Sequence, residues 1–215
     1  YGEIAPTNPV SLGGYLALIN GAVLLGVKQV KKDADSDSDG VMDSATQAAY
    51  MSAIDDLAGY ISPGVFPDTL VPLKSDDLVL FEYLAQQCDI QSSIRYRAER
   101  TAICGFSAGT QPDTAGEWAV AISRTRFRFV YPDMATITLS RADGTSDSYL
   151  VDGSYVAAAL AGNRASPSID VATPWTGGRL FGFDKLGRDL DAVQQNQIAV
   201  NGVTIMEDRP PLIRV

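Results

Sequence analysis

Short apolar runs alternate with segments of helical periodicity through the first two thirds of the chain. Asn8 and Pro9 are typical of a helix start and Asn20-Gly21 of a helix stop, so a helix is predicted between them. The nearly continuous apolar run that follows predicts a strand, buried on both faces, within residues 22–30. Further strands are predicted at 69–73, 101–106 and 126–131, and further helices at 44–60, 75–88 (capped by Ser75) and 113–123.

Helices recurring between short buried strands predict an α/β fold with a mainly parallel sheet flanked by helices. The pattern changes after Pro132, where apolar and polar residues alternate on both sides of the Asp143-Gly144 turn. This alternation predicts a peripheral antiparallel ribbon at 134–151. The last third predicts a helix at 155–162 capped by Ser154, a short apolar run at 180–183, a helix ending at Asn201-Gly202, and a hairpin of 203–206 with 212–215.

The composition is that of a globular domain, and the net charge limits the kinds of partner that it is expected to bind. Hydrophobic residues make up 46% and charged residues 20% of 215 residues, with a net charge of -9. An acidic surface repels phosphate, so nucleic acid and anionic membranes are not expected as partners. No apolar run reaches the roughly 20 residues that span a bilayer, and the start does not resemble a signal peptide. The order of elements indicates one α/β domain over residues 1–215. Tyr1 in place of Met and the apolar end indicate that this domain is truncated at both ends.

The absence of histidine removes several kinds of chemistry at once. No histidine-based metal site, histidine general base or Ser-His-Asp triad can form within this chain. Cys88 and Cys104 lie in apolar stretches without metal-ligand spacing, so we interpret both as buried free thiols in a reducing compartment. No cofactor and no catalytic residue are expected.

Ser107 is the strongest candidate nucleophile, because residues 105–109 match the Gly-x-Ser-x-Gly elbow pattern after a predicted strand. A serine nucleophile needs a base, and only lysine remains to supply one. The lysines lie in charged or loop contexts: Lys28, Lys31, Lys32, Lys74 and Lys185. We therefore interpret the motif as a glycine turn, with an α/β hydrolase-like enzyme using Ser107 as the alternative.

An acidic segment contains the start of a calcium-loop pattern. Its alternate carboxylates are Asp35, Asp37 and Asp39, followed by Gly40 and Asp43, a spacing that also resembles thrombospondin type 3 loops. The twelfth position is Thr46 in place of the bidentate glutamate of an EF-hand. A solvated acidic connection and a calcium-stabilised binding module both remain open, and a chelator melt distinguishes them.

Arginines alternate along two segments that are predicted to be extended: Arg95, Arg97 and Arg100, and Arg124, Arg126 and Arg128. A phosphate or nucleic-acid site is one interpretation. The acidic net charge favours the other, in which the arginines contact acidic faces of identical subunits. The interface candidates are Arg95, Arg97, Arg126 and Arg128.

From about Val130 onward the sequence resembles the contractile tail sheath proteins of myovirus-type bacteriophages. The order and spacing of several segments carry the resemblance: Val130–Asp133, Gly153–Asn163, Ala172–Pro174, Gly182–Phe183, Asn196–Val203 and Ile213–Val215. The first half supports it through its α/β order, which is similar to the subtilisin-like core domain of that family. That fold name implies no protease activity.

The resemblance implies a virion structural protein rather than an enzyme. Sheath subunits stack as hexameric rings around an inner tail tube, and contraction drives the tube through the host envelope. Terminal arms donate strands to neighbouring subunits in that family. The implied partners are identical sheath subunits and the tail-tube protein, and the implied location is the virion after synthesis in the bacterial cytoplasm. Without the arms, this chain is expected to be monomeric.

Overall fold

The computed structural model describes residues 2–30, 42–58, 67–141, 144–167, 178–209 and 212–214. A four-stranded sheet lies at its centre, with the strand order β1 (Thr69–Leu70), β2 (Thr101–Gly105), β3 (Phe127–Tyr131) and β8 (Thr204–Ile205). All of its neighbouring strands pair in parallel, with Cys104 opposite Phe129. The α/β fold with a mainly parallel sheet is therefore confirmed.

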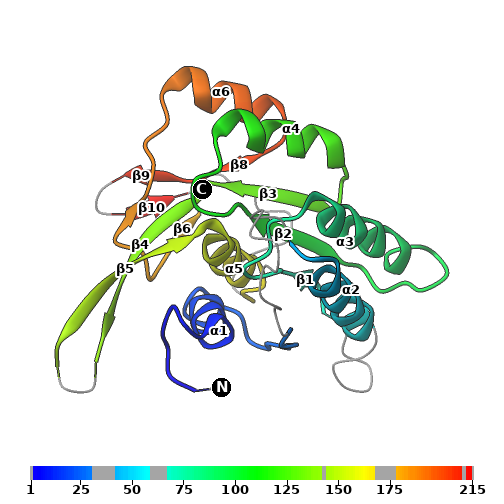
Figure 1. Cartoon of the computed structure of the whole chain (residues 1–215), viewed down its shortest axis with the longest axis horizontal. Helices are drawn as coiled ribbons and strands as arrows, with labels where there is room; N and C mark the ends of the chain where they lie inside the picture. The colour runs from blue at the N-terminus through cyan, green and yellow to red at the C-terminus, as the bar shows by residue number, and fades with distance from the viewer. Residues whose placement is uncertain are drawn as a thin grey trace.

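Helices cover both faces of this sheet (Figure 1). On one face lie α3 (Leu78–Gln91) and α4 (Pro112–Ile122), backed by α2 (Ser44–Ala58) and α6 (Ala192–Val200). On the other face lies α5 (Gly153–Arg164), backed by α1 (Pro9–Ile19). Ten consecutive residues of α5 are buried, because the sheet and α1 cover it from opposite sides.

Alternate residues of the central strands enter two separate hydrophobic clusters, as the pleat requires. Cys104 and Phe129 point toward α3 and α4, whereas Ile103 and Val130 point toward α5 and α1. The first cluster is aromatic: Phe106 stacks on Phe129 with ring centroids 4.8 Å apart, and Phe81 meets the edge of the same ring at 5.5 Å. Both cysteines are buried free thiols, as predicted.

Two small antiparallel sheets flank the central one. The first joins β5 (Ser146–Asp152), β4 (Met134–Ser140) and β7 (Lys185–Leu186), so the predicted ribbon is confirmed and gains a third strand. Figure 1 shows β4 and β5 extending away from the body. The second sheet joins β6 (Arg179–Leu180), β10 (Leu212–Arg214) and β9 (Glu207–Arg209).

The predicted strand at 22–30 is wrong. Those residues follow α1 as an extended segment without a strand partner, and Val23 and Leu24 are exposed. Leu25 packs beside Gly14 of α1, and Lys28 forms an ion pair of 2.6 Å with Asp56 of α2. Packing against a helix can bury apolar side chains without any strand pairing. The segment therefore forms no sheet, although its apolar composition favours a strand.

The C-terminal hairpin was predicted with the wrong first strand. Thr204 and Ile205 pair in parallel with β3 and complete the central sheet, whereas β9 pairs with β10. The adjoining Val203 and Met206 are buried, in different hydrophobic clusters. The sequence of a two-residue strand does not determine which other strand it pairs with.

Two predicted helix caps are also wrong. Asp77, not Ser75, caps α3 by accepting a 2.6 Å hydrogen bond from the Leu80 N–H. Asp152, not Ser154, caps α5 by accepting from the Ser154 N–H at 3.0 Å. Aspartate and serine are comparable caps, so the sequence alone does not choose between neighbours.

Candidate functional site

The carboxyl ends of β2 and β3 meet the start of α5, which is where α/β proteins commonly place a site. The Gly153 N–H donates to both Phe106 O, at 2.9 Å, and Asp133 O, at 2.7 Å. A Cβ on Gly105 would lie 2.0 Å from the Gly153 carbonyl oxygen. The glycine at 105 is therefore required by a close backbone contact.

The second glycine of the Ser107 motif also has a structural explanation. Gly109 has φ +101°, and its N–H donates to Asp133 Oδ2 at 2.7 Å. The Ser107 carbonyl accepts from the Thr110 hydroxyl at 2.8 Å, and α4 begins only at Pro112. Both glycines thus serve the turn and its packing, which supports the glycine-turn interpretation of the motif.

Two lysines, Lys28 and Lys74, line the same cavity as Ser107, and Lys28 is paired with Asp56 of α2. Lys74 is the remaining candidate for a base. Its ammonium forms a 2.7 Å ion pair with Asp152, a side chain that is 10% exposed, and lies 5.3 Å from the Tyr155 ring centroid. Ser154 donates its hydroxyl proton to Asp152 and accepts from the Lys74 N–H. An ammonium paired with a carboxylate has no free electron pair, so this geometry does not supply the base of a Ser-Lys dyad.

The Ser107 hydroxyl itself lacks an activating contact. Within the described ranges it makes no hydrogen bond to a carboxylate or an amine. Ser107 is half-buried at the end of β2. A serine and an ion pair thus line the same cavity without the proton-transfer geometry of a nucleophile.

Asp133 and Arg188 form a second polar pair at this edge. Asp133 is fully buried, and Arg188 Nε lies 3.3 Å from its Oδ1. Arg188 also donates to Gln111 at 2.9 Å, which ties the segment after β7 to the start of α4. Burial, followed by the charge of Asp133, raises the pKa of Tyr131, whose hydroxyl donates to Thr110 O at 3.0 Å. The pair joins three segments, and among the described residues it forms no hydrogen bond with Ser107.

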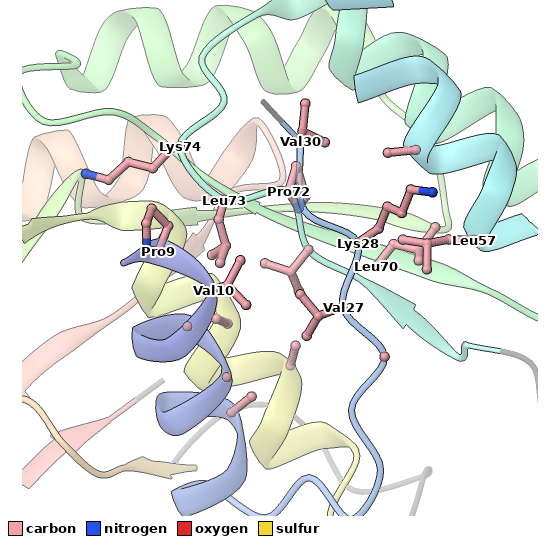
Figure 2. Close-up of a pocket in the computed structure, with 18 of the residues that line it drawn as sticks. Pro9, Val10, Val27, Lys28, Val30, Leu57, Leu70, Pro72, Leu73 and Lys74 are labelled. Carbon is pink, nitrogen blue, oxygen red and sulfur yellow. The ribbon is translucent and has the colours of Figure 1, made fainter. Parts of the chain in front are cut away.

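An apolar cavity of about 930 Å³ opens beside the first polar pair (Figure 2). Figure 2 shows Val10 of α1, Val27 of the extended segment, and Leu70 and Leu73 turned toward this space. Tyr50 closes one side and donates its hydroxyl to Leu73 O at 2.8 Å.

The calcium candidates are only partly placed. Asp35, Asp37 and Asp39 lie outside the described residues, and Asp43 precedes α2, where its carbonyl accepts from the Gln47 N–H. Among the described residues, no three cysteine or carboxylate side chains come together to hold a metal ion. The calcium hypothesis therefore stays a prediction.

The arginines gather at the opposite, amino-terminal edge of the sheet. Arg95 and Arg97 lie in the connection from α3 to β2, and Arg126 precedes β3, beside the start of β2. Arg126 forms a 3.0 Å ion pair with Glu99, whereas Arg128 is exposed and donates to backbone carbonyls. Arg100, by contrast, is 2% exposed and donates to Leu57 O, so it belongs to the interior.

Sequence reasoning missed both polar pairs. Lys74 and Asp152 are far apart in the sequence, as are Asp133 and Arg188, so spacing along the chain gave no signal. Asp133 did lie in one of the segments that carried the family resemblance. No helix in the described part of the chain has the length and apolar composition needed to cross a membrane.

Comparison with known proteins gives a fold and no sequence family. Neither a family model nor a curated protein matches the sequence. A sheath tail protein from Desulfitobacterium hafniense superposes with a TM-score of 0.52 at 15% identity, over 89% of this chain and 39% of that protein. A chain of the anti-feeding prophage baseplate gives 0.51 at 15% identity, over 100% of this chain and 50% of that one.

The chain thus spans half, or less, of the length of each of these solved structures. The likeness extends beyond the region from Val130 onward in which the sequence resemblance was seen, because it covers most or all of the chain. The structure and the sequence therefore agree on one conclusion: this chain has the α/β fold of a tail sheath protein.

Proposed function

We propose that this chain is the core domain of a structural subunit in a contractile tail sheath. The observation that carries the proposal is the fold shared with a sheath tail protein over 89% of the chain. Independent support comes from the sequence segments from Val130 onward, which resemble those of contractile tail sheath proteins. The core corresponds in this proposal to the subtilisin-like domain that the resemblance implies.

In this proposal the subunit binds identical subunits and the inner tube protein within a virion. Sheath subunits form stacked hexameric rings and shift between two lattices when the sheath contracts. Such a shift requires a body that stays rigid while its outer contacts rearrange. The three-layer packing and the ion pair between the buried Asp133 and the half-buried Arg188 support a rigid body of this kind.

The proposed role does not use Ser107 as a nucleophile. We expect Ser107→Ala to leave assembly of the intact protein unchanged, because no described group accepts the hydroxyl proton. Hydrolysis of activated esters, compared for wild type and variant, measures any catalysis. Esterase activity that disappears in Ser107→Ala would favour the hydrolase alternative.

Surface arginines are the proposed contacts with neighbouring subunits. Arg128 is the cleaner test, because Arg126 is already paired with Glu99 and its replacement would leave that carboxylate alone. Charge reversal at Arg128 is expected to weaken assembly only modestly, since an exposed ion pair contributes about 0–1 kcal/mol.

Electron microscopy of the complete gene product that carries this sequence tests the proposal directly. We expect hollow tubes whose wall consists of stacked rings. Particles that remain dispersed at high protein concentration, with and without purified tail-tube protein, would contradict it.

A further inference from the structure

The turn between α3 and β2 is held in one conformation by its own backbone. Within the turn, residues 93–97, the N–H groups of Tyr96 and Arg97 donate to Ser93 O at 3.1 and 2.8 Å. At its base, Ser92 Oγ accepts from the Arg100 N–H at 2.8 Å. Arg97 Nε donates back to Ile94 O at 3.4 Å. The 93–97 turn is therefore an ordered feature of the surface.

This ordered turn presents apolar side chains to solvent. Ile94 is 87% exposed and Tyr96 is 48% exposed, and Ile90 on the last turn of α3 is exposed as well. The Arg95 guanidinium lies over the Tyr96 ring, 5.3 Å from its centroid. Exposed aromatic, aliphatic and arginine side chains together are the composition of protein-interface hot spots.

Arg97 adds backbone strain to this exposure. Its φ is +55°, in the left-handed region where glycine is favoured. Placing an arginine rather than a glycine at this position strains the backbone but provides a guanidinium on the turn. Strained backbone of this kind clusters at binding sites. The strain therefore points to a role for the side chain rather than for the turn alone.

The charges of the turn are not used within the described residues. Neighbouring arginines are paired, Arg124 with Asp89 and Arg126 with Glu99. Arg95 and Arg97, by contrast, form no ion pair with any described carboxylate. Two unpaired cations on a chain of net charge -9 are complementary to the remainder of that chain's own surface.

We propose that the 93–97 turn is a docking element that binds an apolar surface with an exposed carboxylate on a second copy of this chain. The inference rests on the proposed function, because it names the contact by which subunits would join. Ile94 and Tyr96 supply buried area, and Arg95 and Arg97 supply orientation toward carboxylates. The preformed turn loses little conformational entropy on binding.

The matching surface is the outer side of α4 and α6. These helices lie together, with Gln197 donating to Asp113 at 2.8 Å, and they expose Val120, Val193 and the carboxylate of Glu117. In Figure 1 the 93–97 turn lies at the right-hand end of the molecule, beyond α3, whereas α6 and the start of α4 lie at the top. A contact between two different surfaces is heterologous, and it extends from copy to copy into a ring or a helix.

The experiment uses the complete gene product and two matched variants. Ile94→Ser with Tyr96→Ser removes the apolar part of the turn, whereas Leu150→Ser removes a similarly exposed side chain from the ribbon. We expect the first variant to lower the assembled fraction in sedimentation by about tenfold and the second to leave it unchanged. Equal melting temperatures show that both variants fold.

A charge exchange tests the proposed partner. Arg95→Glu with Arg97→Glu is expected to block assembly, and adding Glu117→Lys in the same chain is expected to restore part of it. Normal assembly of both turn variants would overturn the proposal while leaving the sheath function intact. Loss of assembly without rescue by Glu117→Lys would overturn the assignment of α4 and α6.

Failure of the complete wild-type protein to assemble would count against the proposed function. In that case the docking element is tested by the self-association of this 215-residue chain and its turn variants. At millimolar concentration and low salt, weak self-association that the turn variants abolish supports the docking element. Identical monomeric behaviour of wild type and variants overturns it. Binding of a polynucleotide that depends on Arg95 and Arg97 would assign another class of partner and overturn it too.

Discussion

Gly105 and Gly153 bring the ends of two strands and one helix into backbone contact. The Gly153 N–H reaches both Phe106 O and Asp133 O, and a Cβ at Gly105 would overlap the Gly153 carbonyl. This contact, rather than any nucleophile, accounts for the first glycine of the Ser107 motif. A sequence pattern associated with catalysis thus arises here from packing.

Gly105→Ala is expected to be strongly destabilising. The added methyl group meets backbone atoms, which cannot rotate away, so we expect a loss of about 3 kcal/mol or more in the free energy of unfolding. Gly144→Ala is the control, because its φ of +84° is strained but its Cβ would meet open space. It should lose about 1–2 kcal/mol. Urea denaturation measures both, and equal losses would contradict the packing argument.

The buried thiols make the stability of the fold depend on pH in the alkaline range. Burial raises the pKa of Cys88 to about 12 and also raises the pKa of Cys104. Above about pH 9 the unfolded thiol ionises while the folded thiol stays protonated, so stability falls as pH rises toward 12. Each thiol contributes a slope of up to about 1.4 kcal/mol per pH unit.

Denaturation midpoints at about pH 7.5 and about pH 10 test this expectation. The variant Cys88→Ala with Cys104→Ala should lose less stability between those values than the wild type. Its remaining loss reflects buried tyrosines such as Tyr131 and Tyr155, whose pKa values burial also raises. The same pH dependence in both proteins would exclude the thiols as the cause.

At the scale of elements, the start of α3 links two helices. Asp77 accepts from the Leu80 N–H as a cap and from Gln47 of α2 through both carboxylate oxygens, at 3.0 and 3.1 Å. One carboxylate therefore fixes where α3 begins and how α2 lies against it. Capping of this kind connects a local signal to tertiary packing.

Asp77→Ala should cost about 1–2 kcal/mol, because it removes the cap and leaves the Gln47 amide without this partner. Ser75→Ala is the matched control, since Ser75 is buried two residues earlier and its hydroxyl caps nothing. Thermal melts of the two variants rank them. A larger loss of stability for Ser75→Ala than for Asp77→Ala would contradict this assignment and support Ser75 as the cap.

At the scale of the molecule, charge governs association. The net charge of -9 opposes self-contact at low salt, and the contact proposed for the 93–97 turn is small. We therefore expect this chain to sediment as a monomer at micromolar concentration, at about 50 mM and about 500 mM salt. A stable hexamer of this chain would contradict that expectation.

The sequence by itself determined the elements whose signals are local. Short apolar runs between helical segments predicted β2 and β3, Asn8 and Pro9 predicted the start of α1, and the Asp143-Gly144 turn predicted the ribbon. The absence of histidine removed the usual base for Ser107 before any geometry was known. The signals for these strands, the helix start and the ribbon each lie within a few residues, because caps, turns and pleats are short-range structures.

Only the tertiary structure decided which segments became partners. The apolar run at 22–30 packs on α1 instead of joining the sheet, and Thr204 and Ile205 take a place beside β3. Lys74 found Asp152, and Asp133 found Arg188, across long stretches of chain. Hydrophobic burial and ion pairing have no preference for sequence neighbours, so such choices depend on the packing of the whole chain.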